Sequence, residues 1–247
     1  MSKLKDKVAI VTGASKGIGA SIAKHFAAEG ASVVVNYSSS KEGAERVVTD
    51  IKNAGGKAIA VQANVAKKSD IDRLFAEAKT AFGRLDILVN NAGVYEFLPL
   101  EGVTEEHFHK HFNLNVLGLI MATQKAVESF GSNGGSIINI SSVVGVAPVA
   151  GGSVYCASKA AVHFAAMCMR HQLAPLRIRV VEVLPPVVDT DLSKNSPVAK
   201  MPVAVFAKKF LSRLSKGENV MNIGQTAGLE KFSRFFPSMA FKMLNKQ

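Results

Sequence analysis

The chain has 247 residues, 48% of them hydrophobic and 20% charged, which is enough apolar material for one substantial core. No apolar run approaches the ~18 residues that span a bilayer, and the first apolar run is too short for a secretory signal, so we expect a cytoplasmic protein with no integral membrane segment. The net charge of +11 is compatible with nucleic-acid binding, but the basic residues are scattered without a dense block. We therefore expect a basic solvated surface and no nucleic-acid partner.

Short apolar runs alternate with amphipathic segments along the chain. The runs predict strands at 7–11, 32–37, 57–62, 86–90, 136–141, 178–184 and 219–224. The amphipathic segments predict helices near 17–29, 41–54, 69–82, 104–130, 153–174 and 198–215. Ser69 and Thr104 are suited to cap two of these helices. The pattern predicts an α/β fold, a single doubly wound domain over residues 1–247 with about seven parallel strands and helices on both faces.

A glycine-rich loop, "TGASKGIG" at 12–19, separates the first strand from the first helix. Glycine permits a tight turn and lets the backbone approach a pyrophosphate, and the N-terminus of the next helix favours an anion. In this strand–helix context the motif predicts a dinucleotide-binding loop. The expected cofactor contacts are Gly13, Ser15, Lys16, Gly17, Ile18 and Gly19.

The end of the second strand, "VVVNYSSSK", bears on the choice of dinucleotide. It lacks the carboxylate that would hydrogen-bond the adenosine ribose of NAD. Its hydroxyls, with Lys41 and with Lys16 of the glycine loop, could instead accept a 2′-phosphate. We therefore expect NADP(H) to be preferred over NAD(H); the alternative is that these residues only shape the turn. The expected contacts are Asn36, Tyr37, Ser38 and Ser39.

"YCASK" at 155–159 places Tyr155 and Lys159 four residues apart, on one face of a predicted helix. Reduction of a carbonyl by hydride creates an alkoxide that must be protonated, and an unperturbed tyrosine has a pKa of about 10. An ammonium about 5 Å away would lower that pKa by roughly 2 units. The pair is therefore expected to act as a proton donor and its electrostatic tuner.

Several separated motifs in this order resemble the short-chain dehydrogenase/reductase family over about residues 5–192. They are the glycine loop, "NNAG" at 90–93, Asn115 in "FNLNVLG", Ser142 after "INIS", and "YCASK". The resemblance implies a Rossmann-type fold, interconversion of a carbonyl and an alcohol, and a homo-oligomer. It also implies that Tyr155 is the general acid/base, that Lys159 holds the nicotinamide ribose, that Ser142 binds the carbonyl oxygen and that Asn115 positions a relay water.

The resemblance implies further cofactor contacts at Asn64, Val65, Asn90, Asn91, Ala92, Gly93, Pro185, Val188 and Thr190. Pro185-Pro186 stands where many members have Pro-Gly, so we expect a stiffer loop beside the nicotinamide. The first half is similar to 3-oxoacyl-carrier-protein reductases and glucose dehydrogenases. The part after residue 153 resembles putative oxidoreductases of D-alanyl-lipoteichoic-acid operons.

The expected substrate walls, at 94–103, 143–152 and 187–203, are mainly apolar, which favours a partly apolar small molecule. A 3-oxoacyl-carrier-protein reductase is the alternative, with Lys194 and Lys200 as candidate carrier contacts. A non-catalytic NADP(H)-sensing protein is an alternative of another class. Ser142 lacks a G-x-S-x-G elbow, which argues against a hydrolase.

The tail at 226–247 is an amphipathic extension with an apolar stripe opposite basic residues, and Pro237 should break it. We expect it to pack on the domain or over the active-site mouth, with membrane-surface or partner contact as the alternative. The family's usual ending is absent, so a dimer through 104–130 and 153–174 is expected, with a tetramer still open.

Two further residue patterns favour structural over chemical roles. Cys156 and Cys168 would lie roughly 18 Å apart on one helix, too far for a disulfide, and are expected to be reduced core or near-core thiols. His107 and His111 in "HFHKH" have helical spacing, but no nearby third ligand is evident. We expect solvated histidines and no metal.

Overall fold

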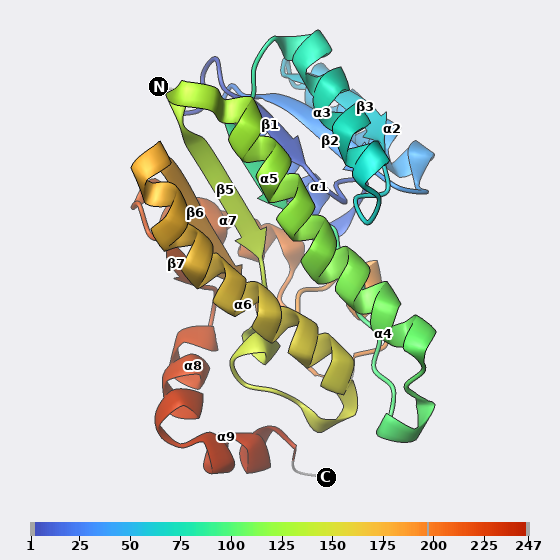
Figure 1. Cartoon of the computed structure of the whole chain (residues 1–247), viewed down its shortest axis with the longest axis vertical. Coiled ribbons are helices and arrows are strands. Elements are labelled where there is room, and N and C mark those ends of the chain that lie inside the picture. Colours follow the sequence, from blue (N-terminus) through green and yellow to red (C-terminus); the bar gives the residue numbers. More distant parts are fainter. Residues whose placement is uncertain (1–2, 197, 246–247) are drawn as a thin grey trace.

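The computed structural model describes residues 3–196 and 198–245, and its centre is one parallel sheet (Figure 1). Within these residues the sheet has seven strands in the order β3-β2-β1-β4-β5-β6-β7. The strands are β1 Val8–Val11, β2 Ser32–Tyr37, β3 Lys57–Gln62, β4 Ile87–Asn90, β5 Gly135–Ile140, β6 Ile178–Leu184 and β7 Val220–Asn222. The prediction of a doubly wound α/β fold is confirmed.

Most helices begin and end within two residues of their predicted positions. They are α1 Gly17–Ala28, α2 Lys41–Asn53, α3 Lys68–Phe82, α4 Glu105–Phe112, α5 Leu119–Phe130, α6 Ser153–Leu173, α7 Val203–Ser215, α8 Thr226–Phe235 and α9 Pro237–Leu244. The larger difference is at α7, which starts after Pro202, five residues later than expected.

The two predicted helix caps differ in outcome. Thr104 caps α4, because its side chain accepts a hydrogen bond from the backbone N–H of His107. The prediction for Ser69 is wrong, since α3 begins one residue earlier, with Lys67 at the N-cap and no side-chain capping bond.

The predicted helix 104–130 is interrupted by a π-helical turn at Asn113–Gly118. Such turns occur frequently at functional sites, and this one contains Asn115.

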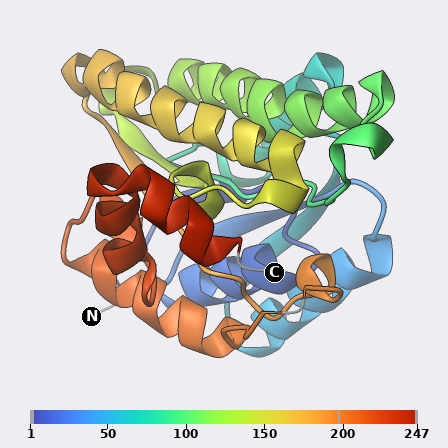
Figure 2. The same ribbon diagram turned by 90° about the horizontal axis from the view of Figure 1, so that it is seen from below.

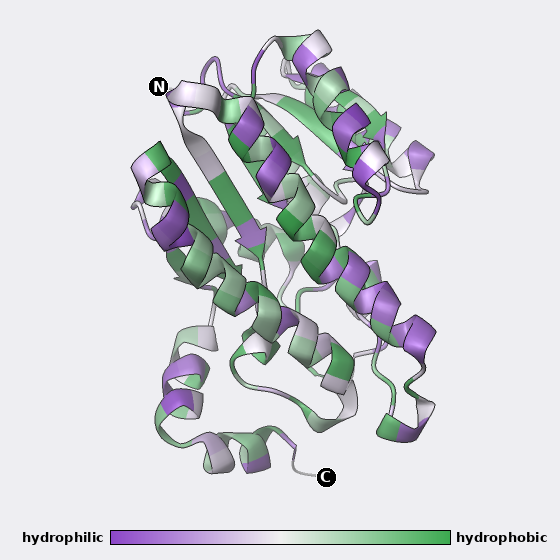
Figure 3. Cartoon of the chain, in the orientation of Figure 1, coloured by the Kyte–Doolittle hydropathy of each residue, from purple (hydrophilic) through white to green (hydrophobic). Residues whose placement is uncertain are grey.

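Helices cover both faces of the sheet, with α3, α5 and α6 on one side and α1, α2 and α7 on the other (Figure 2). The strands are mainly hydrophobic (Figure 3), as expected for strands buried on both faces. On the α1–α7 side, the rings of Phe26, Phe206 and Phe210 stack and are fully buried. On the other side, Leu74 and Phe130 belong to a second core cluster. Truncating any of these phenylalanines to alanine should cost about 3–5 kcal/mol.

The strand order reverses direction at β1, whose neighbours are β2 and β4. In open parallel sheets, ligands bind in the crevice outside the carboxyl ends of the strands at such a point. The segments that follow β1, β2, β3, β4, β5 and β6 therefore gather at one edge. All the predicted site motifs except Asn115 and "YCASK" lie in these segments, and those two are brought to the same edge by the helices.

The C-terminal extension packs on the domain beside a predicted substrate wall, where Figure 1 shows α8 and α9 below α6. Ser233 donates a hydrogen bond to the carbonyl of Val146 at 2.8 Å. Asn245 accepts one from the backbone N–H of Ala150 at 2.6 Å. Pro237 breaks the extension as expected, because α9 begins there. Exposed apolar side chains remain on it, at Phe235, Phe236, Met239, Phe241 and Met243.

Two remaining expectations concern the cysteines and the membrane. Both cysteines are free: Cys156 is buried, as expected, but Cys168 is exposed, so its placement near the core is wrong. Cys168 lies on the outer side of α6, a helix covered on only one face. Among the described residues, no helix has both the length and the apolar character needed to cross a bilayer.

Candidate active site

The glycine loop after β1 is shaped by close backbone contacts. Gly13 and Gly17 have φ values of +60° and +59°, which only glycine adopts at low cost. A Cβ atom on Gly13 would lie 2.9 Å from Cα of Ala92. A Cβ atom on Gly17 would lie 3.1 Å from the Thr190 methyl group. The loop is therefore fitted against the segments that follow β4 and β6, and α1 begins at Gly17.

Two asparagine side chains hold this loop in place. Oδ1 of Asn36 accepts a hydrogen bond from the N–H of Gly13 at 3.1 Å, and its amide donates to the carbonyls of Val61 and Ala63. The amide of Asn91 donates to the carbonyls of Thr12 and Gly13. Asn36 lines the cleft, but its side chain braces the loop, which is the structural role left open by the sequence.

A cleft of about 670 Å³ runs along the carboxyl edge of the sheet, within the usual size range for cofactor sites. Most predicted site residues line it: Gly13, Ser15, Lys16, Gly17, Ile18, Asn36, Ser38, Ser39, Asn64, Val65, Asn91, Ala92, Gly93, Ser142, Tyr155, Lys159, Pro185, Val188 and Thr190. The predicted residues therefore form one continuous surface, although they come from most of the chain.

The remaining predicted residues lie behind the cleft wall. Gly19 packs the loop from behind, where a Cβ atom would lie 2.5 Å from the Asn91 amide nitrogen. Tyr37 is part of the core. The buried amide of Asn90 donates to Thr123 and Asn139. Gly19, Tyr37 and Asn90 therefore support the cleft walls and do not line the cleft, where they would contact a cofactor directly.

Ser142, Tyr155 and Lys159 meet where β5 ends. Tyr155 is 8% exposed, and Ser142 lies close enough to its hydroxyl to influence its ionisation. Lys159 donates to the carbonyl of Ile140 at 2.9 Å, and its Nζ lies 5.9 Å from the centre of the Tyr155 ring. Helix α6 positions the tyrosine and the lysine, and the segment after β5 positions the serine. The three side chains are thus on one side of the cleft.

Burial controls the ionisation of this group. Burial raises the pKa of the Tyr155 hydroxyl, and the nearby Ser142 side chain opposes the rise without cancelling it. Burial lowers the pKa of Lys159 to about 8, against the opposing charge of Glu182. The sequence-based expectation of a lowered Tyr155 pKa is therefore wrong for this arrangement, because desolvation outweighs nearby favourable groups. The phenol stays protonated at neutral pH, which suits a proton donor.

Asn115 links the π-helical turn to the cleft wall. Its Oδ1 accepts a hydrogen bond from the N–H of Val94 at 2.9 Å. Its amide donates to the carbonyl of Val94 at 3.1 Å and to Oγ of Ser158 at 3.0 Å. Asn115 therefore ties the segment after β4 to α6 from behind. The positioning of a relay water by Asn115 stays a prediction.

Sequence reasoning missed a buried pair behind Lys159. Glu182 on β6 is fully buried, and Nδ1 of His163 lies 3.0 Å from both of its carboxylate oxygens. The hydrogen bond with Glu182 raises the pKa of His163. His163 follows Lys159 by one helical turn, and an acid inside the apolar run "IRVVEVL" was the available signal. The pair places negative charge behind the lysine ammonium.

An aromatic wall, Tyr95 and Phe97, faces the proton donor. Their ring centres lie 4.9 Å and 6.0 Å from that of Tyr155, in edge-to-face geometry. Both residues belong to the segment predicted to be an apolar substrate wall, and both line the cleft. Aromatic residues in this geometry offer ring edges and faces to a planar ligand.

An ion pair bridges the mouth of the cleft. Nζ of Lys16 lies 2.9 Å from a carboxylate oxygen of Asp191, and both side chains are exposed. Lys16 lowers the pKa of Asp191. Exposed pairs contribute little to stability, so the lysine can exchange this partner for a phosphate at low cost.

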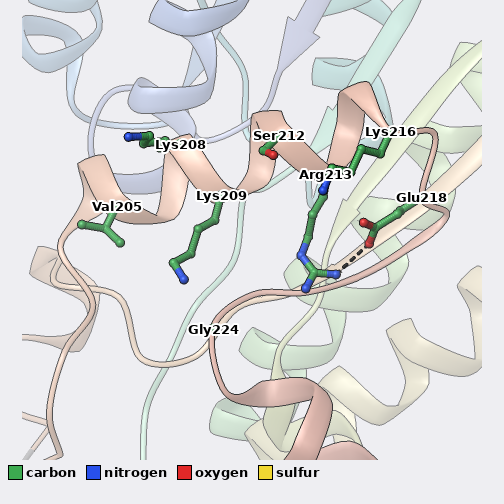
Figure 4. Close-up of a pocket in the computed structure, with 8 residues that line it drawn as sticks. All are labelled: Val205, Lys208, Lys209, Ser212, Arg213, Lys216, Glu218 and Gly224. Carbon is green, nitrogen blue, oxygen red and sulfur yellow. Dashed lines mark hydrogen bonds and ion pairs between the residues drawn. The ribbon is translucent and has the colours of Figure 1, made fainter.

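A second cavity, of about 590 Å³, lies apart from these residues, along α7 (Figure 4). Its lining includes the cations Lys208, Lys209, Arg213 and Lys216. Arg213 contacts Glu218 at 2.7 Å, the pair marked in Figure 4. This cavity along α7 contains none of the predicted catalytic residues. We call it the α7 groove.

The expectation of solvated histidines on α4 is wrong. His107 and His111 are 7% and 0% exposed. Burial lowers the pKa of His111. The expectation that no third ligand lies nearby is also wrong, because the carboxylate of Glu96 approaches both imidazoles. Glu96 is distant in sequence and precedes α4, so helical spacing alone could not reveal it.

Comparison with known proteins shows the family to which the chain belongs. The profile of the short chain dehydrogenase family matches residues 7–200. An uncharacterized oxidoreductase of Methylorubrum extorquens is 48% identical, over 90% of each chain. A probable tetrahydroxynaphthalene reductase of Zymoseptoria tritici is 42% identical over 77% of this chain and 72% of its own.

Among solved structures, a 3-ketoacyl-(acyl-carrier-protein) reductase from Brucella melitensis, complexed with NADH, superimposes with a TM-score of 0.82. It is 31% identical, and the match covers 90% of this chain and 98% of that one. This similarity in sequence and fold agrees with the seven-stranded parallel sheet of this chain. The chain belongs to the short-chain dehydrogenase family and is an oxidoreductase.

Proposed function

We propose that this chain is an NADP(H)-dependent oxidoreductase that interconverts a ketone or aldehyde and an alcohol, with Tyr155 as general acid/base. The observation that carries the proposal is the position of Ser142, Tyr155 and Lys159 in one cleft with the glycine loop. The glycine loop and Ser38 suit the phosphates and adenosine of a dinucleotide, and Lys159 suits its nicotinamide ribose. When bound, the nicotinamide supplies or accepts the hydride.

The chain's own residues account for the proton and the charge. The hydroxyl of Ser142 donates a hydrogen bond to the carbonyl oxygen and polarises it. Tyr155 then delivers a proton to the oxygen as the alcohol forms, and it takes that proton back in the reverse direction. The ammonium of Lys159 favours the transient phenolate, and the buried charge of Glu182 favours that ammonium.

The preference for NADP(H) rests on the charge around the cleft. Ser38, Ser39 and Ser40 line it after β2, where no carboxylate is present, and Lys16 faces the same opening. We expect kcat/KM to be higher with NADPH than with NADH. Lys16→Ala should lower kcat/KM for NADPH and leave kcat/KM for NADH unchanged. Lys24→Ala, which removes an exposed cation farther along α1, should change neither value. Better turnover with NADH would contradict the preference.

The substrate side favours a partly apolar ring ketone. The aromatic wall stands next to Tyr155, and Val143, Val144 and Val149 also line the cleft. The similarity to a tetrahydroxynaphthalene reductase supports the same class. A panel of carbonyls and alcohols, followed at the nicotinamide absorbance, tests this. Bicyclic aromatic ketones should be turned over with higher kcat/KM than charged aliphatic ones, and the opposite order would contradict the proposal.

A 3-oxoacyl-carrier-protein reductase is the second candidate, because a basic surface would suit an acidic carrier. Besides Lys194 and Lys200, the α7 groove offers Lys208, Lys209 and Arg213, and the Brucella relative has this activity by name. Lys209→Glu should then raise the KM for a carrier-bound 3-oxoacyl thioester without changing that for a free one. An equal KM for both would remove this candidate. If the native chain binds NADPH but turns over no carbonyl or alcohol, the alternative of a non-catalytic NADP(H)-sensing protein would be favoured.

A dimer through α4–α6 is supported by exposed apolar side chains on these helices, namely Phe108, Leu117, Phe164 and Met167. Such side chains on a water-facing surface favour association. Sedimentation should show a dimer for the native chain and a monomer for Phe164→Glu. A monomeric native chain would contradict this. A cytoplasmic location remains a prediction.

A further inference from the structure

A cluster of possible metal ligands lies behind the aromatic wall, where Glu96, His107 and His111 meet. One ligand atom from each of the three residues lies within 4.8 Å of the other two. The imidazole centres are 4.4 Å apart, one helical turn from each other on α4. Glu96 comes from the segment after β4. Two imidazoles spaced i and i+4 on one helix face form a recurring half of a metal site.

His107 is poorly satisfied by the protein alone. Its side chain is 7% exposed, and neither ring nitrogen has a hydrogen-bond partner. A buried polar group without a partner destabilises the fold, so native proteins seldom retain one without a reason. A cation bound to one of these nitrogens would offset that cost.

The other two side chains have partners that a metal would partly replace. Nδ1 of His111 donates to the carbonyl of His107 at 2.9 Å, and its Nε2 accepts a hydrogen bond from the backbone N–H of Glu96 at 3.3 Å, a bond that coordination by Nε2 would replace. Histidine ligands in proteins are normally fixed by a bond from the second nitrogen, here Nδ1. Lys110 holds one carboxylate oxygen of Glu96, while the other lies 3.9 Å from Nε2 of His107.

We propose that Glu96, His107 and His111 bind a divalent transition metal of the zinc class. Two imidazole nitrogens and one carboxylate oxygen match zinc, which takes three protein ligands with an open fourth position. Calcium and magnesium prefer all-oxygen sites. Metal–ligand bonds of about 2.0–2.2 Å require the three side chains to move closer together, and half-exposed Glu96 can do so by a rotamer change.

The bound metal would act on the substrate side of the enzyme. Glu96 lies between Tyr95 and Phe97, and the ring of His111 lies 6.3 Å from that of Tyr155, in edge-to-face geometry. Coordination therefore fastens the aromatic wall to α4. The expected consequence is a changed KM for the carbonyl substrate, with the affinity for the dinucleotide unchanged. The metal site itself does not rest on the proposed function.

Cobalt(II) titration of the full chain, stripped of metal with a chelator and free of any affinity tag, tests the site. We expect one equivalent to give the intense visible absorption of a four-coordinate cobalt centre, and zinc to displace it. His107→Gln and Glu96→Gln should each weaken cobalt binding at least about 10-fold, the loss seen when even an outer partner of a ligand is removed. The readout does not depend on turnover.

His109→Gln is the matched control. His109 lies on the same helix with its own i,i+4 carboxylate, Glu105, at 3.4 Å, but both side chains are exposed. This variant should bind cobalt as the native chain does. Metal-free thermal unfolding shows whether each variant is folded. If His107→Gln does not fold, Glu96→Gln carries the test, because Glu96 is half-exposed. Absence of a four-coordinate spectrum, or equal losses in His109→Gln and Glu96→Gln, would overturn the proposal.

Discussion

The cofactor side and the substrate side of the cleft are built differently. The glycine loop is held by buried asparagine side chains and by backbone contacts closer than a Cβ atom would permit. The substrate walls consist of short 3₁₀ turns and irregular segments, tied down by a few long-range hydrogen bonds such as those of Asn115 and Asn245. The cofactor side is therefore fixed by close backbone packing. The substrate side has fewer such constraints, so its sequence can vary with little effect on the fold.

The junction of the two sides carries the chemistry, so the largest expected effect is at Ser142. Ser142→Ala removes the donor to the carbonyl oxygen and should lower kcat by about 10²- to 10³-fold. The affinity for NADPH should stay the same, because the glycine loop is not affected. Steady-state kinetics and NADPH fluorescence titration measure the two quantities. Ser142→Thr, which retains a hydroxyl, should recover part of the rate; no loss in Ser142→Ala would place the oxyanion elsewhere.

The cofactor side should respond in affinity. Gly13→Ala forces an alanine into φ +60° and against the Ala92 backbone. The left-handed conformation alone costs about 1–2 kcal/mol, so NADPH binding should weaken roughly 5- to 30-fold if the loop shifts to relieve it. Gly55→Ala is the control, since Gly55 has φ +81° and no atom within 4 Å of the added Cβ. It should lower thermal stability but leave NADPH affinity unchanged; equal affinity losses would contradict the account.

The pH dependence tests the electrostatics of the junction. The Lys159 pKa, lowered to about 8, means that its charge is present below pH 8 and lost above it. The raised pKa of Tyr155 keeps the phenol protonated over the same interval. Carbonyl reduction should therefore fall above pH 8, to roughly one-tenth at pH 9. In Lys159→Arg, any residual rate should lack this decline. A reduction rate that rises through pH 8–9 would contradict the assignment.

The substrate side should show the smallest effect, in KM. Asn245→Ala removes the bonds from the C-terminal extension to Ala150 and Pro148. A single hydrogen bond contributes about 0.5–1.5 kcal/mol, so the KM for the carbonyl should rise roughly 2- to 10-fold. The KM for NADPH should not change. A larger effect on NADPH than on the carbonyl would show that the two sides are not separate.

Sequence patterns predicted the fold, and most of the residues that line the cleft, for a physical reason. Apolar runs fix strands, and the requirement for glycine at Gly13 is local. Contacts between distant segments could not be predicted: Asn36 bracing the loop, Glu182 behind Lys159, and Glu96 beside two histidines depend on packing. The predicted direction of the Tyr155 pKa shift was wrong for the same reason, because burial is a property of the folded chain.

The most direct test of the proposed reaction is carbonyl reduction by Tyr155→Phe under single-turnover conditions with NADPH. The variant keeps the ring that packs on Tyr95 and removes only the proton donor. Hydride transfer should slow by about 10²- to 10⁴-fold, with NADPH affinity unchanged. Tyr95→Phe, which removes a hydroxyl from the aromatic wall, should retain the native rate within a few-fold. A native rate in Tyr155→Phe would remove this residue from the mechanism.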